Sequence, residues 1–579
     1  MNRLFLQLFV GFSLTVLLIL GIIHSRRDSL LVGACRRGSP QMVGLMLNLG
    51  AKPDGFGKLA GEPIRYACYS SNITTVRLLL SKGATITHKY EDGATLLMEA
   101  AAQTKNPEVI TTLLQAGAKV DERDDDGFTP MMEAAAYNSN VNVITTLLKA
   151  GASLSDRDIS HNETPLMHAA RSSSSVEVIA TLLKAGASMN DRNKDNRPPL
   201  SLAALNNPNL KVITALIEAG GDVNDRDMHG QTPLTCAGQH NRNPEVIPLL
   251  IKAGAKMDNI DNGGFTPFIS AASSTHYPAM ITMYLSCGAK LDECDTHGQT
   301  PLICAAKGNE SPQVITTLLE AGAKIDERDK KNRTPLMGAA GGNENPQIVA
   351  TLLKAGADVN ARNIDGATPL VFALQSPKAS EVIPILLKAG AKVDDPNDDG
   401  FTPLMDAVSF SSDPAVISLL IKAGANVNVK SKDGLTPLMC AAANTSNIEI
   451  FNLLLKAGAR ATDHDKLGST ALMIAAQFTQ NPDVITKLLE AGANIDEQDK
   501  LGMTALMYAA QYTTNPDILS KLLKAGANPF LMSEFKMTAY KYAAGASDNF
   551  YGMSFNIRPA NPALKGTAAL EELKQASHQ

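Results

Sequence analysis

A short apolar stripe recurs throughout the chain, and a clear copy of it is formed by Leu336, Ala339 and Ala340. Residues at spacings of three and four lie on one face of a helix. Thr334 stands just before this stripe and can cap the helix with its hydroxyl, while Pro335 suits the first helical position because no amide hydrogen is needed there. The pattern therefore predicts a short helix that begins at Pro335.

A second stripe follows within the same unit. Asn345 and Pro346 repeat the signal for the start of a helix, and Gly356 is placed to end that helix in a left-handed cap. Between them the apolar positions follow an i, i+1, i+4, i+5 pattern, which is formed by Ile348, Val349, Leu352 and Leu353. The two stripes together predict a helical hairpin.

The segment after this hairpin, residues 358–366, is rich in Asn, Asp and Gly, which tolerate tight turns. We expect it to form an extended finger that leads to the next unit. The position of Thr334 has counterparts, nearly all of them Thr, at 95, 129, 164, 198, 232, 266, 300, 368, 402, 436, 470, 504 and 538, so the interval is 34 residues except for one of 35. We refer to this position as the anchor of each repeat.

Two weaker copies of the unit are anchored at Ser29 and Glu62, so about sixteen repeats occupy nearly all of the chain after residue 28. A single hairpin cannot bury its own apolar stripe and must stack on its neighbours. Contacts in such an array stay local, and the array grows without a central core. We therefore expect one long domain in spite of the length of 579 residues.

The motif Thr-Pro-Leu-x-x-Ala-Ala followed by Leu-Leu-x-x-Gly-Ala-x-x-Asx at this period resembles the ankyrin repeat. The resemblance implies an all-α solenoid of stacked helix-turn-helix units with β-hairpin-like fingers, and it implies protein partners. Two features depart from the family pattern. The period is one residue longer than usual, and the family's His after Thr-Pro-Leu is mostly Met, for which we expect apolar packing, as at Met132, Met167, Met337, Met405 and Met439.

The predicted domain organisation follows from these repeats. Residues 1–27 form an N-terminal membrane or signal segment, residues 28–94 form divergent capping repeats, residues 95–537 form the regular repeats, and residues 538–579 form a C-terminal capping repeat with a tail. Within the tail, Pro562 to Ala576 carries spaced Leu residues that predict a helix. We expect that helix to replace the second helix of the last repeat.

Leu4 to Ile23 is a mostly apolar run that is long enough to span a bilayer, and it predicts one N-terminal hydrophobic helix and a single-pass membrane protein. The run is long for a cleaved signal and lacks an Ala-x-Ala site, so an uncleaved anchor is favoured over a removed signal. Arg26 and Arg27 beyond the run favour cytoplasmic repeats by the positive-inside rule, whereas exported proteins also begin with a basic residue and an apolar run. The side of the membrane on which the repeats lie stays open.

Composition and motifs give no support for catalysis. The net charge of −5 provides no basic surface for nucleic acid. The chain has no phosphate-binding glycine loop, no H-E-x-x-H motif and no serine elbow, and its His residues are too scattered to bind a metal together. The seven Cys residues mostly occupy Ala-like sites or equivalent sites in separate repeats, where stacked helices stand too far apart for a disulfide. We therefore expect no enzyme activity, no cofactor, no metal site and no small-molecule substrate.

The acidic fingers have two interpretations. Runs such as residues 121–126 and 326–329 could attract cations or a basic partner. Arg residues recur in the same row, at Arg123, Arg157 and Arg328 among others, and Arg and Asp in stacked turns tend to neutralise one another. The structural interpretation is favoured.

Residues that vary on the constant scaffold mark the candidate partner-binding surface. In arrays of this family, the position before the anchor and the fourth and eighth positions after it line the fingers and the concave helix face. The fourth position holds charged residues such as Glu99, Glu133, His168 and Asp406. The apolar and aromatic candidates at the three positions are Phe128, Tyr137, Phe265, Phe372, Phe401, Phe410, Leu435, Phe478, Met503, Tyr508, Tyr512 and Tyr542.

These candidates also have two interpretations, because the rings could bind a partner or pack between neighbouring first helices. Aromatic residues make up only 5% of the chain, so their concentration between Phe401 and Tyr542 indicates a candidate protein-binding surface. The sequence predicts a non-catalytic protein-interaction scaffold that binds through finger tips and the concave face. The alternative is a structural or elastic envelope element without a defined partner.

Overall fold

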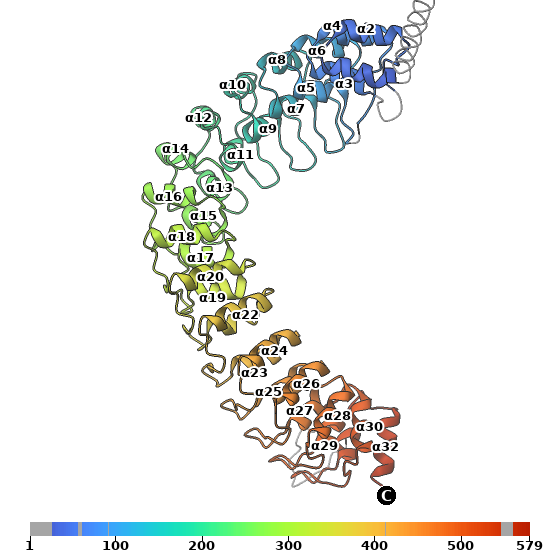
Figure 1. The fold of residues 1–579 in the computed structure, drawn as a ribbon, viewed down its shortest axis with the longest axis vertical. Coiled ribbons are helices and arrows are strands. Elements are labelled where there is room, and N and C mark those ends of the chain that lie inside the picture. Colours follow the sequence, from blue (N-terminus) through green and yellow to red (C-terminus); the bar gives the residue numbers. More distant parts are fainter. Residues whose placement is uncertain (1–25, 56–60, 91, 412, 546–559, 579) are drawn as a thin grey trace, which may run out of the picture. The chain divides into compact units, whose positions relative to one another are not determined.

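The computed structural model describes residues 26–55, 61–90, 92–411, 413–545 and 560–578 (Figure 1). Within this part of the chain every regular element is a helix, and the helices follow one another in pairs. The chain divides into two compact units, Met1–Lys290 and Leu291–Gln579. Each unit is a stack of helical hairpins.

The described part of unit 1 starts with helical residues 26–36. The first helices of its later repeats are α3 (Glu62–Tyr69), α5 (Leu96–Gln103), α7 (Pro130–Tyr137), α9 (Pro165–Ser172), α11 (Pro199–Asn206), α13 (Pro233–His240) and α15 (Pro267–Ser274). The second helices are α2 (Pro40–Asn48), α4 (Ile73–Ser81), α6 (Pro107–Gln115), α8 (Val141–Lys149), α10 (Val176–Lys184), α12 (Leu210–Glu218), α14 (Val246–Lys252) and α16 (Pro278–Ser286). Successive first helices pack on one another along the unit, and so do successive second helices.

Unit 2 repeats this arrangement. Its first helices are α17 (Pro301–Gly308), α19 (Pro335–Gly342), α21 (Pro369–Ala373), α23 (Pro403–Phe410), α25 (Pro437–Asn444), α27 (Ala471–Phe478), α29 (Ala505–Tyr512) and α31 (Ala539–Ala544). Its second helices are α18 (Pro312–Glu320), α20 (Pro346–Lys354), α22 (Ala379–Lys388), α24 (Pro414–Lys422), α26 (Ile448–Lys456), α28 (Pro482–Glu490), α30 (Pro516–Lys524) and α32 (Ala568–Ala576). The helix α21 is shorter than the other first helices because it ends at Ala373, four residues before Pro377.

The helix starts and stops confirm the sequence pattern. The hydroxyl of Thr334 accepts a hydrogen bond from the amide of Met337 at the start of α19, and the side chain of Asn345 accepts one from the amide of Gln347 at the start of α20. Gly356 follows α20 with a φ of 95°, which only glycine adopts without strain. The predicted helical hairpin is therefore the unit of the fold.

The interior consists of the two predicted stripes. Leu336, Ala339 and Ala340 are fully buried, as are Ile348 and Val349 on the facing helix. The position of Met337 is also buried, which confirms apolar packing at the site of the family's histidine. Its sulfur lies 3.5 Å from the backbone amide of Thr334, so the thioether also supplies a weak acceptor at the helix start.

The fingers are tight turns without a regular β-strand in the described residues, and the β-hairpin-like form is limited to isolated antiparallel bridges, which pair Lys89 with Thr95 and His464 with Thr470. In a typical finger the carboxylate of Asp329 accepts hydrogen bonds from the amides of Lys331 and Arg333 at 2.9 and 2.8 Å. A single backbone hydrogen bond of 3.1 Å from Lys330 to His297 joins this finger to the preceding one. A finger closed this tightly by one side chain leaves no residues for a strand ladder.

Buried asparagines join successive repeats. The Nδ2 of Asn343 donates hydrogen bonds to the carbonyls of Ala306 and Asn309 in the preceding repeat, at 2.9 and 2.8 Å. The same pair of bonds is made by Asn138, Asn207, Asn241 and Asn561. These bonds satisfy carbonyls at the ends of the first helices and fix the spacing of the stack.

The C-terminal helix α32 packs against α30 and α31 in the place where a second helix is expected. Asn561 makes the interrepeat hydrogen bonds that precede a second helix elsewhere, and Leu564 and Leu573 are fully buried. The helix is shorter than the predicted range of 562–576, because it begins at Ala568. A displaced second helix thus covers the end of unit 2.

The predicted N-terminal hydrophobic helix, residues 4–23, lies outside the described residues. Among the helices that the structure does describe, none combines the length and the apolar character that a membrane crossing requires.

Candidate functional site

The eighth position after the anchor is where the structure exposes predicted rings. Tyr137, Phe410 and Phe478 stand at the ends of their first helices with 63%, 68% and 51% of their surface exposed. Tyr512, at the same position, is half-buried. We call the surface formed by the fourth and eighth positions of the first helices, together with the adjoining fingers, the first-helix face.

The other predicted rings are more covered. Before the anchor, Phe128, Phe265, Phe401 and Leu435 are half-buried and Met503 is buried. At the fourth position Phe372 and Tyr508 are half-buried and Tyr542 is buried. The structure therefore distinguishes three rings that are more than half exposed from nine candidates that are half-buried or buried against the scaffold.

Two tyrosines at the fourth position fasten their helix to its finger. The Tyr508 hydroxyl donates to the Oδ2 atom of Asp499 at 2.7 Å, and the Tyr542 hydroxyl lies 2.9 Å from the Ser533 hydroxyl. Burial, followed by the hydrogen bond to Asp499, raises the pKa of Tyr508 above its ordinary value, so the phenol stays protonated as a donor. The Tyr508 ring also stacks on Tyr512 at 6.2 Å. These contacts give Tyr508 and Tyr542 a structural role in addition to any role in binding.

Three consecutive finger tips carry apolar residues that sequence reasoning missed. Leu467, Leu501 and Phe535 lie 34 residues apart, and 67%, 47% and 57% of their surfaces are exposed. In the earlier regular repeats the corresponding tips carry Asp, His, Lys or Gly. That change from polar to apolar residues at one repeat position was the signal available in the sequence.

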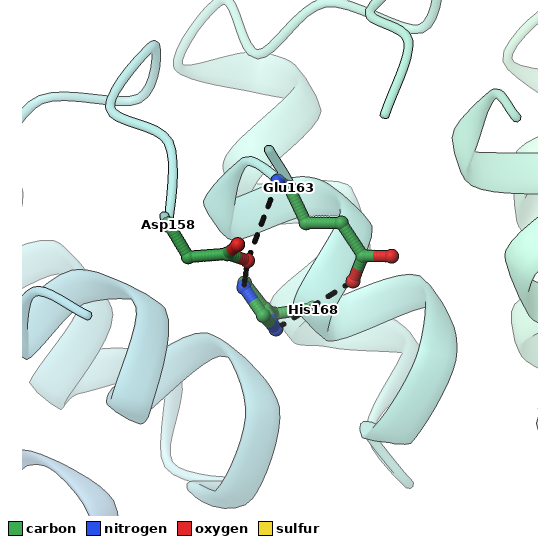
Figure 2. A group of neighbouring side chains, drawn as sticks. All are labelled: Asp158, Glu163 and His168. Atoms are coloured by element: carbon green, nitrogen blue, oxygen red, sulfur yellow. Dashed lines mark hydrogen bonds and ion pairs between the residues drawn. The ribbon is translucent and has the colours of Figure 1, made fainter. Parts of the chain in front are cut away.

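The 35-residue repeat contains a buried charged cluster, drawn in Figure 2, of Asp158, Glu163 and His168. The Nε2 atom of His168, on α9, lies 2.8 Å from Oδ2 of Asp158 in the finger. Its Nδ1 atom lies 3.9 Å from Oε2 of Glu163. The ring of Phe128, from the preceding repeat, stands 4.6 Å from the His168 ring between centroids and covers it.

Asp, Glu and His are metal-ligand types, but in this cluster they already have partners. Oδ1 of Asp158 accepts hydrogen bonds from the amides of His161 and Asn162. Glu163 forms an ion pair with Arg171 and accepts a hydrogen bond from Asn193 at 3.1 Å. Burial raises the pKa of Asp158, but the hydrogen bonds from His168 and the His161 amide outweigh it and hold that pKa well below its ordinary value. The arrangement fastens the finger to α9, as the tyrosines do in later repeats.

The acidic fingers are bridged by arginines, as the structural interpretation predicts. Arg123, Arg157 and Arg328 each donate a 2.8 Å hydrogen bond to a backbone carbonyl of the next finger. Arg123 and Arg157 also form ion pairs with the next finger, at 3.1 Å to Asp156 and 2.9 Å to Asp191. These arginines neutralise the fingers from within the chain.

The cysteines are all free. Cys35, Cys68, Cys236, Cys304 and Cys440 are buried, Cys287 is half-buried and Cys294 is exposed. Burial raises the pKa of the Cys236 thiol to about 12, so this thiol is neutral and unreactive. The buried thiols act as small apolar side chains.

Comparison with known proteins covers most of the chain. The family described as "Ankyrin repeats (3 copies)" matches residues 66–158, 97–193, 200–283, 269–363, 336–431, 410–499, 438–533 and 472–550. A solved structure, the ankyrin repeat domain of Bcl-3, described as a unique member of the IkappaB protein family, shares 29% identity over 39% of this chain and 99% of its own, with a TM-score of 0.34. No curated protein matches the chain. On the family match, this chain belongs to the ankyrin-repeat family.

Proposed function

We propose that this chain is a non-catalytic scaffold that binds partner proteins through the first-helix face and the finger tips. Ankyrin repeats are generally protein–protein interaction modules, and family members are typically non-catalytic. The observation that carries the proposal is that Tyr137, Phe410 and Phe478, at one repeat position, each leave more than half of their surface exposed. Aromatic side chains are favoured anchors in protein interfaces because they bury a large area at a small cost in entropy.

The finger tips extend this surface in unit 2. Leu467, Leu501 and Phe535 stand on successive fingers that are joined by backbone hydrogen bonds, from Lys500 to Leu467 and from Glu534 to Leu501, both at 2.9 Å. The tips are therefore held at a fixed spacing before a partner arrives. A partner that spans several repeats gains many modest contacts without first ordering the surface.

Site-specific photo-crosslinking tests this proposal. A benzophenone side chain at Phe410 should crosslink to a discrete partner in cells, whereas the same group at Asn452, exposed on the second helix α26, should not. Replacing Tyr137, Phe410 and Phe478 together with Ser should remove partner capture at another crosslinking position, Leu467, and leave the helical circular dichroism unchanged. Equal crosslinking at both positions, or none at either, would instead favour a structural or elastic element without a defined partner.

We also propose that residues 4–23 attach the repeats to a membrane. The support is the apolar length of this run and the arginines that flank it. A tag after Gln579 should sediment with membranes, and deletion of residues 4–23 should release it. Protease access to the tag in intact cells then decides on which side the repeats lie, and a shortened soluble chain would indicate a cleaved signal instead of an anchor.

A further inference from the structure

Two carboxylates on the first-helix face have no donor among the described residues. Glu133 on α7 and Asp406 on α23 occupy the fourth position after their anchors. Asp406 is only 8% exposed, and no hydrogen bond or ion pair engages its carboxylate. Glu133 is mostly covered, and its carboxylate also has no hydrogen bond or ion pair with a described residue. A largely covered carboxylate without a protein partner is destabilising, because its lost hydration is not offset by a hydrogen bond or a counter-charge.

An exposed ring stands one helical turn beyond each of these carboxylates. Tyr137 follows Glu133 by four residues on α7, and Phe410 follows Asp406 by four residues on α23. Residues at this spacing lie side by side on a helix. Glu133 and Tyr137 also line one cavity of about 210 Å³ together with Glu99, which is enough space for a long side chain. The same combination of acid and ring thus occurs once in each unit.

Another carboxylate at the fourth position shows which group can pair with it. In the repeat before that of Glu133, Glu99 forms an ion pair with Arg65, whose Nη2 lies 2.8 Å from Oε1 of Glu99. The guanidinium of Arg65 also lies over the Tyr90 ring, 4.5 Å from its centroid. A cation is therefore held between a carboxylate and a ring within this scaffold. Glu133 and Asp406 have the carboxylate and the ring, but no cation from the part of the chain that the structure describes.

From this arrangement we infer that the Glu133–Tyr137 and Asp406–Phe410 pairs are sockets for lysine or arginine side chains of a protein partner. The inference rests on the proposed interaction function and names the chemistry of the partner. The cation supplies the donor that the carboxylate lacks, and the ring covers the aliphatic stem of the cationic side chain. Burial raises the pKa of Asp406 to about 6, and burial together with Asp124 and Glu99 raises that of Glu133 to about 7. A cation bound beside either carboxylate lowers its pKa again, because it stabilises the ionised form.

The neighbouring surface specifies the rest of the partner segment. Phe372 stands at the fourth position one repeat before Asp406, and Cys440 stands there one repeat after it. Neither residue is charged at neutral pH. Phe372 has no ionisable group, and burial raises the pKa of the Cys440 thiol to about 12. Phe372 is half-buried and Cys440 is buried, so a segment that fits this site presents one basic residue next to an apolar residue that meets Phe372.

Selection from two random-peptide libraries, one with all amino acids and one without Lys and Arg, tests the inference on the full chain in detergent. We expect binders from the complete library to carry a basic residue next to an apolar one. The library without Lys and Arg can also yield binders, and their binding can be lost when Tyr137, Phe410 and Phe478 are replaced with Ser. That result would overturn the inference of cation sockets and leave the proposed interaction function intact. An absence of binders from both libraries would count against both proposals.

Neutral isosteres then locate the sockets. For a selected basic peptide, Asp406→Asn or Glu133→Gln should weaken binding about tenfold, the effect of losing one charge-assisted hydrogen bond. Asp517→Asn removes the same charge from an exposed position on the second helix α30 and should leave binding unchanged. Exchanging the peptide's basic residue for norleucine should abolish the difference between wild type and the socket variants. Equal binding by wild type and both socket variants would overturn the inference.

Discussion

The hydroxyl of Tyr284 on α16 donates a 2.7 Å hydrogen bond to the carbonyl of Leu234 on α13, 50 residues earlier in the chain. Tyr284 is fully buried at a position where most other second helices carry Leu. Space for the phenol comes from Gly238, which stands where most repeats have Ala. A Cβ atom at Gly238 would lie 2.7 Å from the Tyr284 hydroxyl oxygen. The two exceptions to the repeat pattern are therefore a matched pair.

Gly238→Ala should destabilise unit 1 by about 1–3 kcal/mol, because overpacking a filled core forces side chains and backbone to shift. Gly338→Ala on α19 is the matched control, since a Cβ there meets its nearest atom at 3.5 Å. It should stabilise the helix by about 0.5–1 kcal/mol through the helix propensity of Ala. Urea denaturation of each variant measures both effects.

The pairing of Gly238 with Tyr284 has its own test. The double variant Gly238→Ala, Tyr284→Leu restores the residues found in most other repeats, so it should be more stable than Gly238→Ala alone. Additive losses in the double variant would show that Gly238 is retained for some reason other than the Tyr284 ring.

Asn343→Asp should be among the most damaging isosteric changes in the stack. Asn343 is 2% exposed and donates to two carbonyls, and a carboxylate there would face both of them with no proton to donate. We expect a loss of at least about 2 kcal/mol, because two buried acceptors lose their donor and a charge is buried. The change Asn345→Asp two residues later is the comparison: it loses one exposed hydrogen bond, from Nδ2 to the Glu310 carbonyl, and Asp413 already caps α24 in the equivalent place. Hydrogen exchange of α19 and α20 should accelerate much more in the first variant.

Much of the fold could be predicted because each repeat encodes its own helices. The Thr334 cap, the Pro335 start and the Gly356 stop act within one turn of their own positions, so one sequence contains the whole signal. The fingers were less predictable. Whether a turn extends into strands depends on how tightly its own side chains close it, and Asp329 closes its finger within four residues.

The candidate site was predictable only as a set of positions. Exposure at a given position depends on which side chain the adjacent finger and repeat provide. Tyr508 is held by Asp499, whereas Phe478 at its own position meets no such partner and stays exposed. The apolar finger tip Leu501 could not be predicted from its own repeat, because it differs from the other tips only when the same position is compared along the array.

Thiol labelling gives a direct check of the packing. Cys294 is exposed, whereas Cys236, Cys304 and Cys440 are buried with raised pKa values of about 12. A maleimide should modify Cys294 within the dead time of mixing, and the buried thiols only after denaturant is added. Mass spectrometry of the labelled peptides identifies each site. Rapid labelling of Cys236 in the folded protein would show that the first helices of unit 1 separate readily.

Asp406 makes the stability of unit 2 depend on pH. Its pKa in the folded protein is raised by burial from 3.8 to about 6, so the folded state binds more protons than the unfolded state between these values. Stability should therefore fall as pH rises through this window and level off above about 6. Asp406→Asn should remove that dependence and stabilise the protein at neutral pH by about 1–3 kcal/mol, since one pKa unit corresponds to about 1.4 kcal/mol. Urea midpoints across the window, compared with Asp517→Asn at an exposed site, measure the difference. A midpoint for Asp406→Asn that follows the wild type at every pH would show that the Asp406 carboxylate is solvated in the folded state.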